Sequence, residues 1–314
     1  MTMKGVRGLD APGWWYVRLY PGGLDRLDRA VVDVLRPLAG QAVSQGAVRW
    51  FYIQYTDWRG PHLRLRIHGP RGLLDDLHAR LPELNAQCAE PGRRRTGERT
   101  SLFDVDVRPF AGRFAGADTA VYEPEYGKYG GPDGVRLAEE VFQHSSDIAL
   151  WAADFPRVPD RAALAALLMA SAVRSLDVLA GPVGDESGGT ALRPVRFWER
   201  HLQWWTQDAG SAAEELRSRL CAEAARDRRG IGPRMAELAR HTEVAERLAG
   251  WTALLASHLR EAVESGVPRT PGHLLFHQVH MMTNRLGVLP REEAMLGVLA
   301  SRPVALDPPA PTPG

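Results

Sequence analysis

The sequence has few cysteines, almost no net charge and no long apolar run. Each of these absences excludes a class of protein. Cys88 and Cys221 are too far apart to form a metal-binding pair or a disulfide framework, which favours a reducing compartment. The formal net charge of +1 excludes the broad positive surplus that non-specific nucleic-acid binding requires. The sequence contains no stretch of about 18 apolar residues, the length that would predict a membrane helix, and residues 1–15 lack the pattern of a signal peptide. We therefore expect a soluble, cytoplasmic protein that binds neither nucleic acid nor membrane.

The sequence motifs of several common enzyme classes are also missing. There is no GxGxxG motif after a predicted strand, no Walker loop, no GxSxG elbow and no CxxC pair. Nucleotide cofactors are therefore not expected, and we predict no cofactor. Lysine is scarce as well, with only Lys4 and Lys128 against 37 arginines. Because arginine is raised throughout the chain, a single arginine says little about function.

The chain has 314 residues, 44% of them hydrophobic, and the pattern of apolar residues differs between its two halves. Aromatic or alternating stretches predict strands over residues 13–19, 47–56, 62–68 and 101–109. Apolar residues at helical spacing predict helices over 24–38, 73–84, 135–154, 161–179, 192–206, 212–226, 235–260 and 273–286. The predicted fold class is α+β, with one domain over residues 1–302 (β-rich 13–131, helical 132–302) and a proline-rich tail over 303–314.

A predicted β-hairpin contains the first candidate site. Residues 62–68, HLRLRIH, alternate between polar and apolar side chains, so Arg64 and Arg66 should share one face of the strand, about 7 Å apart. Two guanidinium groups at this spacing can bind a carboxylate or polarise amide carbonyls, because they donate forked hydrogen bonds and stay charged. A solvated strand face would have the same spacing. The aromatic and titratable neighbours that favour a site are Tyr52, Tyr55, Trp58 and His62.

The second candidate is the tyrosine-rich segment of residues 121–131, VYEPEYGKYGG. Tyr122 and Tyr129 are candidate proton donors, and Glu123 and Glu125 are near enough in sequence to share a site with basic partners. Loops rich in tyrosine and carboxylates are common places for function. A loop that only caps the following helix would have the same composition, so both interpretations stay open.

The third candidate is a row of histidines near the end of the chain. On the last predicted helix, His273, His277 and His280 are spaced i, i+4 and i+7 and share one face. Zinc binding is not favoured, because the HExxH pattern and a nearby carboxylate are both missing. His280, followed about one turn later by Asn284 and Arg285, is a better candidate for acid–base chemistry. The alternative is a hydrogen-bonded histidine of the core.

Three separated segments together resemble the C-terminal domain of lantibiotic dehydratases, the thiopeptide-type bacteriocin biosynthesis family. They are FYIQYTDWRGPHLRLRIHG, VYEPEYGKYGG with Phe142 and Ser146 downstream, and HMMTNRLG. The similarity runs from about Trp14 to Leu299, nearly the whole chain. In the lantibiotic enzymes this domain removes glutamate from glutamylated serine or threonine and leaves dehydroamino acids. The resemblance implies an elimination site at Arg64, Arg66 and His280.

The chain departs from the eliminating members of this family at two places. Those enzymes tend to have an arginine directly before the second glutamate of the tyrosine-rich segment, where this chain has Pro124. Their Asp-Ser pair after the following helix corresponds to Ser145 and Ser146. The missing guanidinium, which would hold the departing glutamate, favours a diverged relative known from thiopeptide pathways, the pyridine synthase. That relative joins two dehydroalanines of a precursor peptide by a formal (4+2) aza-cycloaddition, with loss of water and leader peptide and without a redox cofactor.

The resemblance implies a role for each candidate residue. The catalytic candidates are His280, Arg64, Arg66, Tyr122 and Tyr129, and the substrate-binding candidates are Asn284, Arg285, Glu125, Ser146 and Tyr55. In this interpretation His280 shuttles protons, the two hairpin arginines polarise an amide oxygen, and one tyrosine donates a proton during dehydration. Asn284 and Arg285 orient the histidine. Such a site needs the hairpin arginines to lie near His280, in a cavity between sheet and helices.

Two other functions stay open. One is a glutamate-eliminating lyase that works with a separate glutamylating partner. The other is a non-catalytic subunit that binds the precursor peptide in a modification complex. In every case the expected partner is a precursor peptide with a leader and a dehydroalanine-containing core, and a homodimer is compatible with each. A groove with apolar walls and a few arginines would bind the leader, with residues 93–99, RRRTGER, as one source of positive charge.

Overall fold

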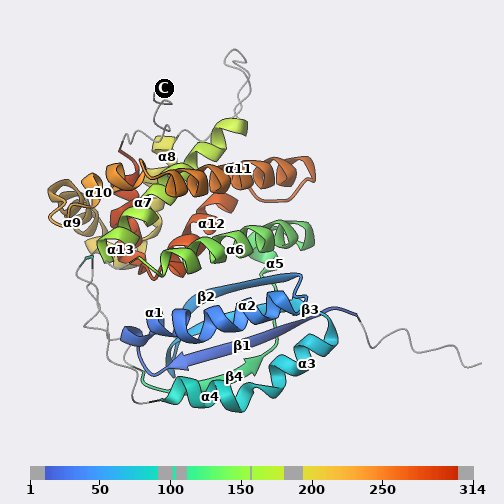
Figure 1. Cartoon of the computed structure of the whole chain (residues 1–314). Coiled ribbons are helices and arrows are strands. Elements are labelled where there is room, and N and C mark those ends of the chain that lie inside the picture. The colour runs from blue at the N-terminus through green and yellow to red at the C-terminus, as the bar shows by residue number, and fades with distance from the viewer. Residues whose placement is uncertain (1–10, 91–101, 104–111, 156–157, 180–193, 303–314) are drawn as a thin grey trace, which may run out of the picture. The chain divides into compact units, whose positions relative to one another are not determined.

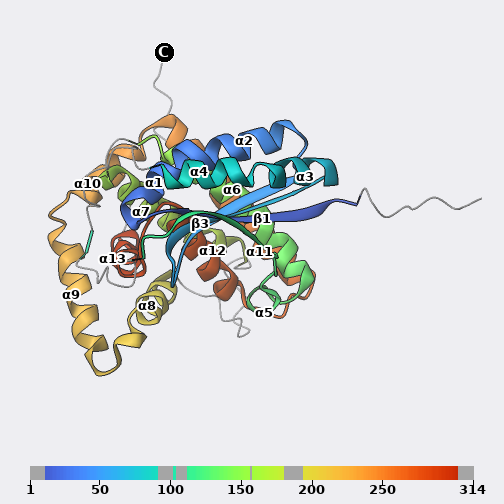
Figure 2. The same ribbon diagram turned by 90° about the horizontal axis from the view of Figure 1, so that it is seen from below.

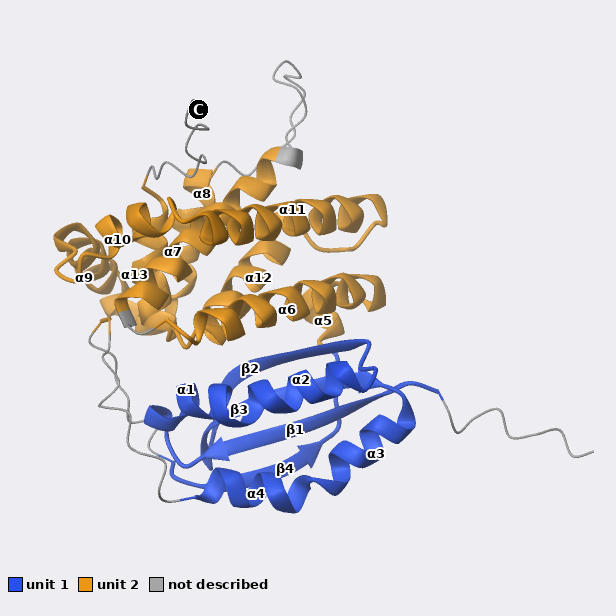
Figure 3. Ribbon diagram, in the orientation of Figure 1, with its two compact units in different colours: residues 1–100, 106–124 blue, residues 101–105, 125–314 orange. Residues whose placement is uncertain are grey.

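The structure, a computed structural model, describes residues 11–90, 102–103, 112–155, 158–179 and 194–302. The chain divides into two units, coloured separately in Figure 3. The first comprises residues 1–100 and 106–124, and the second comprises residues 101–105 and 125–314. The first unit contains a sheet with helices and the second contains helices. The predicted α+β class, with a β-rich first half and a helical second half, is confirmed.

The first unit is built on a four-stranded antiparallel sheet (Figure 1). Its strands are β1 (Gly13–Pro21), β2 (Arg49–Asp57), β3 (Gly60–Gly69) and β4 (Ala115–Ala120), and they lie in the order β2-β3-β1-β4. The first three confirm the strands that aromatic and alternating residues predict. β2 and β3 form the predicted hairpin, whose last pair is Asp57 with Gly60.

The strand register gives the sheet one apolar face and one polar face. Val17 of β1 pairs with Leu65 of β3, which pairs in turn with Tyr52 of β2, and all three side chains are buried. The helices of the unit cover this face (Figure 2). Neighbouring pairs, such as Tyr16 with Arg66, point to the opposite face because successive side chains alternate along a strand. The predicted segregation of apolar residues from arginines along β3 is therefore confirmed.

The helices of the first unit are more broken than their sequence periodicity predicts. The predicted helix 24–38 is a run of short pieces, η1 (Leu24–Arg26), α1 (Leu27–Ala30), η2 (Val31–Leu35) and α2 (Arg36–Ser44). The η2 piece is a π-helical turn. We attribute the wider turn to Pro37, which has no N–H to donate and whose ring would clash with the carbonyl four residues earlier. The predicted helix 73–84 is two helices, α3 (Arg71–Ala79) and α4 (Leu81–Ala89), and Pro82 lies in the first turn of the second.

Strand β4 is not predicted by the sequence. Its residues, AGADTA, are small and have low strand propensity. The strand instead depends on its neighbour, because Arg18 of β1 donates two hydrogen bonds, of 2.7 and 3.0 Å, to the carboxylate of Asp118. Most of the predicted strand 101–109 lies outside the described residues, and residues 102–103 form a bend.

The second unit contains α5 (Tyr126–Tyr129), α6 (Pro132–Ala152), α7 (Val158–Arg174), η4 (Ser175–Leu179), α8 (Pro194–Trp204), η5 (Gln207–Ala212), α9 (Ala213–Arg226), α10 (Ile231–Leu238), α11 (Thr242–Glu264), α12 (Pro271–Arg285) and α13 (Pro290–Ala300). The predicted helix 235–260 is divided into α10 and α11 at residues that include neither proline nor glycine. α13 is not predicted, because its residues are buried on nearly every side and show no amphipathic period. Within the described ranges, no helix combines the length and apolar character needed to cross a membrane.

Candidate active site

The polar face of the sheet holds Arg64 in a defined position. Its Nε donates a hydrogen bond of 3.1 Å to His62 Nε2, and its guanidinium carbon lies 3.4 Å from the centre of the Tyr55 ring. His62 is buried, and its Nδ1 donates to the carbonyl oxygen of Gly60 at 3.0 Å. Burial lowers the pKa of His62 to about 4, so the ring is neutral at pH 7 and Nε2 accepts from Arg64. The Arg64 Nη groups make no hydrogen bond to the rest of the described chain, which leaves them for a substrate oxygen.

Arg66 lies among aromatic rings on the same face. Its guanidinium carbon is 4.6 Å from the ring centre of Tyr16, 5.3 Å from that of Tyr122 and 5.6 Å from that of Phe51. Tyr16 and Phe51 are its cross-strand partners, so the register itself builds this arrangement. Arg64, Arg66 and Tyr55 thus share one face, as alternation predicts. Tyr52, expected among these neighbours, lies instead on the apolar face, because it pairs with buried Leu65.

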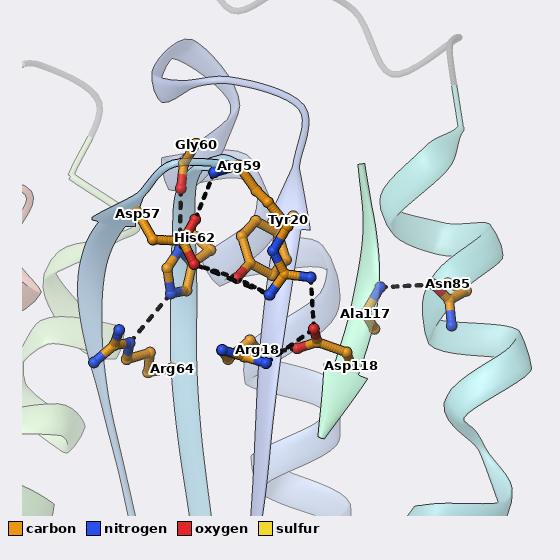
Figure 4. A network of polar contacts seen from close by, with 10 residues as sticks. All are labelled: Arg18, Tyr20, Asp57, Arg59, Gly60, His62, Arg64, Asn85, Ala117 and Asp118. Atoms are coloured by element: carbon orange, nitrogen blue, oxygen red, sulfur yellow. Dashed lines mark hydrogen bonds and ion pairs between the residues drawn. The ribbon is translucent and has the colours of Figure 1, made fainter. Parts of the chain in front are cut away.

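A network of polar contacts stiffens the end of the hairpin (Figure 4). Arg59, in the turn, donates to Asp118 Oδ2 at 2.6 Å and to the Tyr20 hydroxyl at 2.5 Å. Tyr20 donates in turn to Asp57 Oδ2 at 2.7 Å, and the Arg59 backbone N–H donates to Asp57 Oδ1 at 2.9 Å. Both carboxylates are therefore committed to holding the turn. Arg64 has no ion-pair partner among the residues the structure describes, so its positive charge is available to a ligand.

The tyrosine-rich segment divides between the two units. Tyr122 belongs to the first and lies beside Arg66. In the second unit, Glu125 Oε1 forms an ion pair of 2.5 Å with Lys128 Nζ, while Tyr129 is only 1% exposed. The Tyr129 hydroxyl has no hydrogen-bond partner in the described part of the chain, and burial raises its pKa above the ordinary value. Tyr129 is therefore a core residue, and Tyr122 is the tyrosine that accompanies the arginine face.

Helix α12 carries the three histidines on one half-buried face, as their spacing predicts. The rings of His273 and His277 lie 4.5 Å apart, and His273 Nε2 donates to the carbonyl oxygen of Lys128 at 2.9 Å. Burial, followed by the positive charges of His273 and Lys128, lowers the pKa of His277 to about 3, so His277 is neutral at pH 7. Among the described residues, no group of three His, Cys, Asp or Glu side chains could hold a metal ion.

His280 belongs to a buried cluster around Glu293, which we call the histidine–glutamate cluster (His201, Trp205, His280, Thr283 and Glu293). His280 Nδ1 donates to Glu293 Oε2 at 2.8 Å, and the His280 side chain is 22% exposed. Since Nδ1 is committed, Nε2 is the nitrogen left to exchange a proton with a substrate. The carboxylate also accepts from Thr283 Oγ1 at 2.8 Å and from His201 Nε2 and Trp205 Nε1 at 3.1 Å each. Four donors thus satisfy both oxygens of Glu293.

Glu293 is a carboxylate kept ionised inside the protein. Burial alone would raise its pKa, but the electrostatic interaction with His280 and hydrogen bonds from His201 and His280 outweigh burial and lower the pKa to about 2. Glu293 also lies in the first turn of α13, where the positive end of the helix favours negative charge. A fixed carboxylate behind a partly exposed imidazole suits general acid–base chemistry, because it orients the ring and stabilises the imidazolium that forms.

His201 has room beside Glu293 only because residue 297 is glycine. A Cβ at Gly297 would lie 2.7 Å from His201 Nδ1 and 2.8 Å from His201 Cε1. We expect Gly297→Ala to displace His201 and to lower the free energy of unfolding, measured in urea, by about 1–3 kcal/mol. The control is Gly40→Ala in α2, where a Cβ meets open space and should stabilise by up to about 1 kcal/mol. Unchanged stability of Gly297→Ala would contradict this packing.

Arg285 and Ser146 are brought together, as a buried connection between α12 and α6. Arg285 Nε donates to Ser146 Oγ at 3.0 Å, and its Nη1 donates to the carbonyl oxygen of Met281 at 2.8 Å. The guanidinium carbon lies 5.1 Å from the ring centre of Phe142, whose carbonyl oxygen accepts from Ser146 Oγ at 2.7 Å. Arg285 is 2% exposed. These contacts hold two helices together, so any effect of Arg285 or Ser146 on a substrate is indirect in this arrangement.

The predicted site residues fall into two groups by unit. Tyr55, Arg64, Arg66 and Tyr122 belong to the first unit, and Glu125, Tyr129, Ser146, His280, Asn284 and Arg285 belong to the second. The expected proximity of the arginines to His280 stays a prediction. The basic segment 93–99 lies outside the described residues.

Sequence reasoning missed a residue that orients His280. The orienting role of Asn284 and Arg285 stays a prediction, and the structure adds Glu293, whose carboxylate accepts a hydrogen bond from His280 Nδ1. His201 and Trp205, which share that carboxylate, were also absent from the predicted site. The one available signal was an acidic pair, Glu292 and Glu293, in a segment otherwise rich in apolar residues. Buried acidic residues are rare unless they are paired, which makes such a pair worth noting.

Comparison with known proteins assigns the chain to a family. Residues 14–304 match the family described as lantibiotic biosynthesis dehydratase C-term. No curated protein matches the chain.

Three solved structures resemble this one. The tRNA-dependent lantibiotic dehydratase MibB from Microbispora sp. 107891 is 23% identical, with a TM-score of 0.57; the match covers 96% of this chain and 28% of MibB. TsrL is 17% identical, with a TM-score of 0.62 over 93% of this chain and 94% of TsrL. TbtD, a pyridine synthase from thiomuracin biosynthesis, is 17% identical, with a TM-score of 0.55 over 92% of this chain and 96% of TbtD. The chain therefore spans about a quarter of the length of MibB, and at these identities the likeness establishes the fold.

Proposed function

The chain belongs to the lantibiotic biosynthesis dehydratase C-terminal family, and on this premise we propose that it is a pyridine synthase acting on a ribosomally made precursor peptide. The family match over residues 14–304 and the fold shared with TbtD support a role in peptide modification. The observation that favours cyclisation over glutamate elimination is Pro124, which occupies the position where eliminating enzymes tend to have an arginine. Without that guanidinium, a departing glutamate lacks a dedicated cationic partner at this position.

The first proposed step is a tautomerisation. A dehydroalanine and the amide before it become a 2-azadiene when the amide nitrogen loses its proton and the amide oxygen gains one. His280 Nε2 accepts the nitrogen proton, and Glu293 stabilises the resulting imidazolium through the 2.8 Å hydrogen bond to Nδ1. Arg64 and Arg66 polarise the amide oxygen, since their forked donors favour the charge that develops there. Each residue thus lowers the barrier to moving one proton.

The later steps also move protons. Addition of the second dehydroalanine forms two carbon–carbon bonds and closes the ring. The hydroxyl group then leaves with a ring proton as water. The bond between the ring carbon and the leader's amide nitrogen breaks as that nitrogen gains a proton and the ring loses a second proton, so the leader leaves as a carboxamide and the ring becomes a pyridine. We assign the donor of the dehydration step to Tyr122, beside Arg66, in preference to Tyr129, because the Tyr129 hydroxyl is buried.

Mass spectrometry tests this proposal against its alternatives. The protein is incubated with a leader-bearing peptide that contains two dehydroalanines and azoles, and separately with a peptide glutamylated on serine. The expected products are a pyridine macrocycle and an intact leader carboxamide from the first peptide. Loss of glutamate from the second peptide would establish a glutamate-eliminating lyase instead. Binding of both peptides without conversion of either would establish a non-catalytic subunit.

Charge-conserving variants test the hairpin arginines. We expect Arg64→Lys and Arg66→Lys each to lower kcat for cyclisation by about 10- to 100-fold, because lysine keeps the charge but loses the forked donors and the planar contact with the rings. Arg71→Lys, at an exposed position of α3, is the matched control and should leave the rate unchanged. Full activity of both hairpin variants would remove the arginines from the mechanism.

A further inference from the structure

The helical unit contains a groove whose lining shares no residue with the histidine–glutamate cluster. Its volume is about 960 Å³, and it is formed by α9, the turn after α9, the start of α10, α13 and residues 102–103. The floor is apolar and includes buried Ile231, Met295 and Leu299. The rim carries four arginines, Arg219, Arg226, Arg228 and Arg229. The groove therefore joins an apolar floor to a basic rim.

In the part of the chain that the structure describes, most of the rim arginines lack a carboxylate partner. Three carboxylates also line the groove, but Glu223 pairs with Arg226 at 2.6 Å and Asp227 accepts backbone N–H groups at the start of α10. Among the described residues, Arg219, Arg228 and Arg229 have no carboxylate partner, while Glu215 and Asp227 are the acidic side chains of the lining that pair with no cation. The rim thus presents positive charge that the fold does not neutralise.

The turn that carries Arg228 and Arg229 is rigid. Asp227 has a left-handed backbone with φ 37°, and its carboxylate accepts from Ile231 N at 2.8 Å and Gly232 N at 2.7 Å. The N–H of Gly230 donates to the carbonyl oxygen of Asp227 at 2.9 Å, which closes the turn. A turn fixed by three hydrogen bonds presents its arginines with little loss of backbone entropy on binding.

Residues 102–103 form one wall of the groove. The backbone N–H of Leu102 donates to Glu292 Oε1 at 2.8 Å, and Glu292 Oε2 accepts the N–H of Leu289 at 2.9 Å. The Phe103 side chain is 8% exposed, and the guanidinium carbon of Arg219 lies 5.7 Å from its ring centre. The wall therefore adds a large apolar side chain beneath an arginine to the apolar floor.

We propose that this groove binds an acidic, amphipathic segment of the peptide substrate. Its apolar side chains would lie on the floor beside Phe103, and its carboxylates would pair with Arg219, Arg228 and Arg229. The apolar floor favours a peptide over a nucleic acid, whose charged backbone gains nothing from Met295 and Leu299. The inference rests on the proposed function only in taking this segment to be part of the substrate.

Fluorescence anisotropy with two labelled synthetic peptides tests the groove. Both peptides carry leucine at i, i+3, i+4 and i+7, and their polar positions hold glutamate in one and lysine in the other. We expect the glutamate peptide to bind, and Arg228→Glu with Arg229→Glu to weaken that binding at least about tenfold. Arg196→Glu with Arg200→Glu, at two exposed positions of α8 outside the groove, is the charge-matched control and should change binding little. Equal binding of both peptides, or no effect of the double variant, would overturn the proposal, as would displacement of the peptide by a short single-stranded RNA.

A second measurement separates this inference from the proposed function. With a substrate that lacks its leader, the double variant should keep the kcat and KM of the parent protein. With the leader attached, its KM should rise about tenfold while kcat stays the same. Binding of the acidic peptide by a protein without cyclase activity would refute the proposed function and keep the groove. Cyclase activity with equal KM in variant and parent would refute the groove and keep the function.

Discussion

Replacing His280 with phenylalanine should slow cyclisation of a bis-dehydroalanine peptide by about 100- to 10,000-fold, the range by which positioned acid–base groups accelerate proton transfer. Phenylalanine keeps the ring shape beside Trp205, whose ring centre lies 4.7 Å away, but cannot accept a proton. The measurement is single-turnover formation of the pyridine product by mass spectrometry. A normal rate in this variant would remove His280 from the mechanism.

The same helix offers the control for this experiment. His273→Phe makes the same chemical change two turns earlier, where the imidazole donates to the carbonyl oxygen of Lys128 and lies outside the histidine–glutamate cluster. We expect its rate to stay within about threefold of the parent protein. If both variants lose activity equally, the loss reflects damage to α12, and circular dichroism together with thermal unfolding would reveal it.

Glu293→Gln should have the second large effect, on both rate and stability. The amide replaces one oxygen, which accepts from two donors, by an NH₂ group that can only donate. We expect the free energy of unfolding at pH 7 to fall by about 3 kcal/mol, the usual cost of breaking a buried ionic contact. Because His280 loses its orienting acceptor, kcat should fall about 100-fold and the pH profile of kcat should shift. Glu264→Gln, on an exposed residue of α11, is the control and should change neither quantity.

The pH dependence of stability isolates the Glu293 charge. Its pKa falls from 4.5 to about 2 on folding, so its stabilising contribution is complete above pH 4.5 and is lost as the pH falls toward 2. A shift of this size corresponds to roughly 3 kcal/mol. The stability difference between the parent protein and Glu293→Gln, measured in urea, should therefore be constant from pH 7 to 5 and shrink between pH 4.5 and 2. A stability difference that stays constant down to pH 2 would contradict a buried carboxylate stabilised by its histidines. A stable Glu293→Asp variant that restores the pH profile of kcat would support a positioning role for Glu293.

Much of the hairpin could be predicted because its pattern is local. The alternation in β3 places Arg64 and Arg66 on one face, and the structure has them there. The aromatic surround of Arg66 could not be predicted, because Tyr16 and Phe51 reach it from two other strands whose register depends on pairing. For the same reason Tyr52 was expected near the arginines, although one residue of register decides which face it occupies.

The breaks in the helices show a similar division. Pro37 and Pro82 are visible in the sequence and explain where the first unit departs from regular helices. The break between α10 and α11 has no such marker, and β4 has residues that favour no strand. These elements form because neighbouring elements supply hydrogen bonds and packing that local propensity does not contain.

By itself the sequence determined the fold class, the polar face of β3, and the half-buried row of three histidines on α12. These features follow from side-chain periods of two residues in a strand and about 3.6 in a helix, which depend only on neighbours along the chain. Only the tertiary structure decided that Glu293 accepts from His280, 13 residues away, and from His201, 92 residues away. It also decided that Arg285 and Tyr129 lie in the core, and that α9 and α13 form a groove with a basic rim. The physical reason is that contacts between separate helices arise from close packing, and packing is a property of the assembled interior that no local pattern encodes.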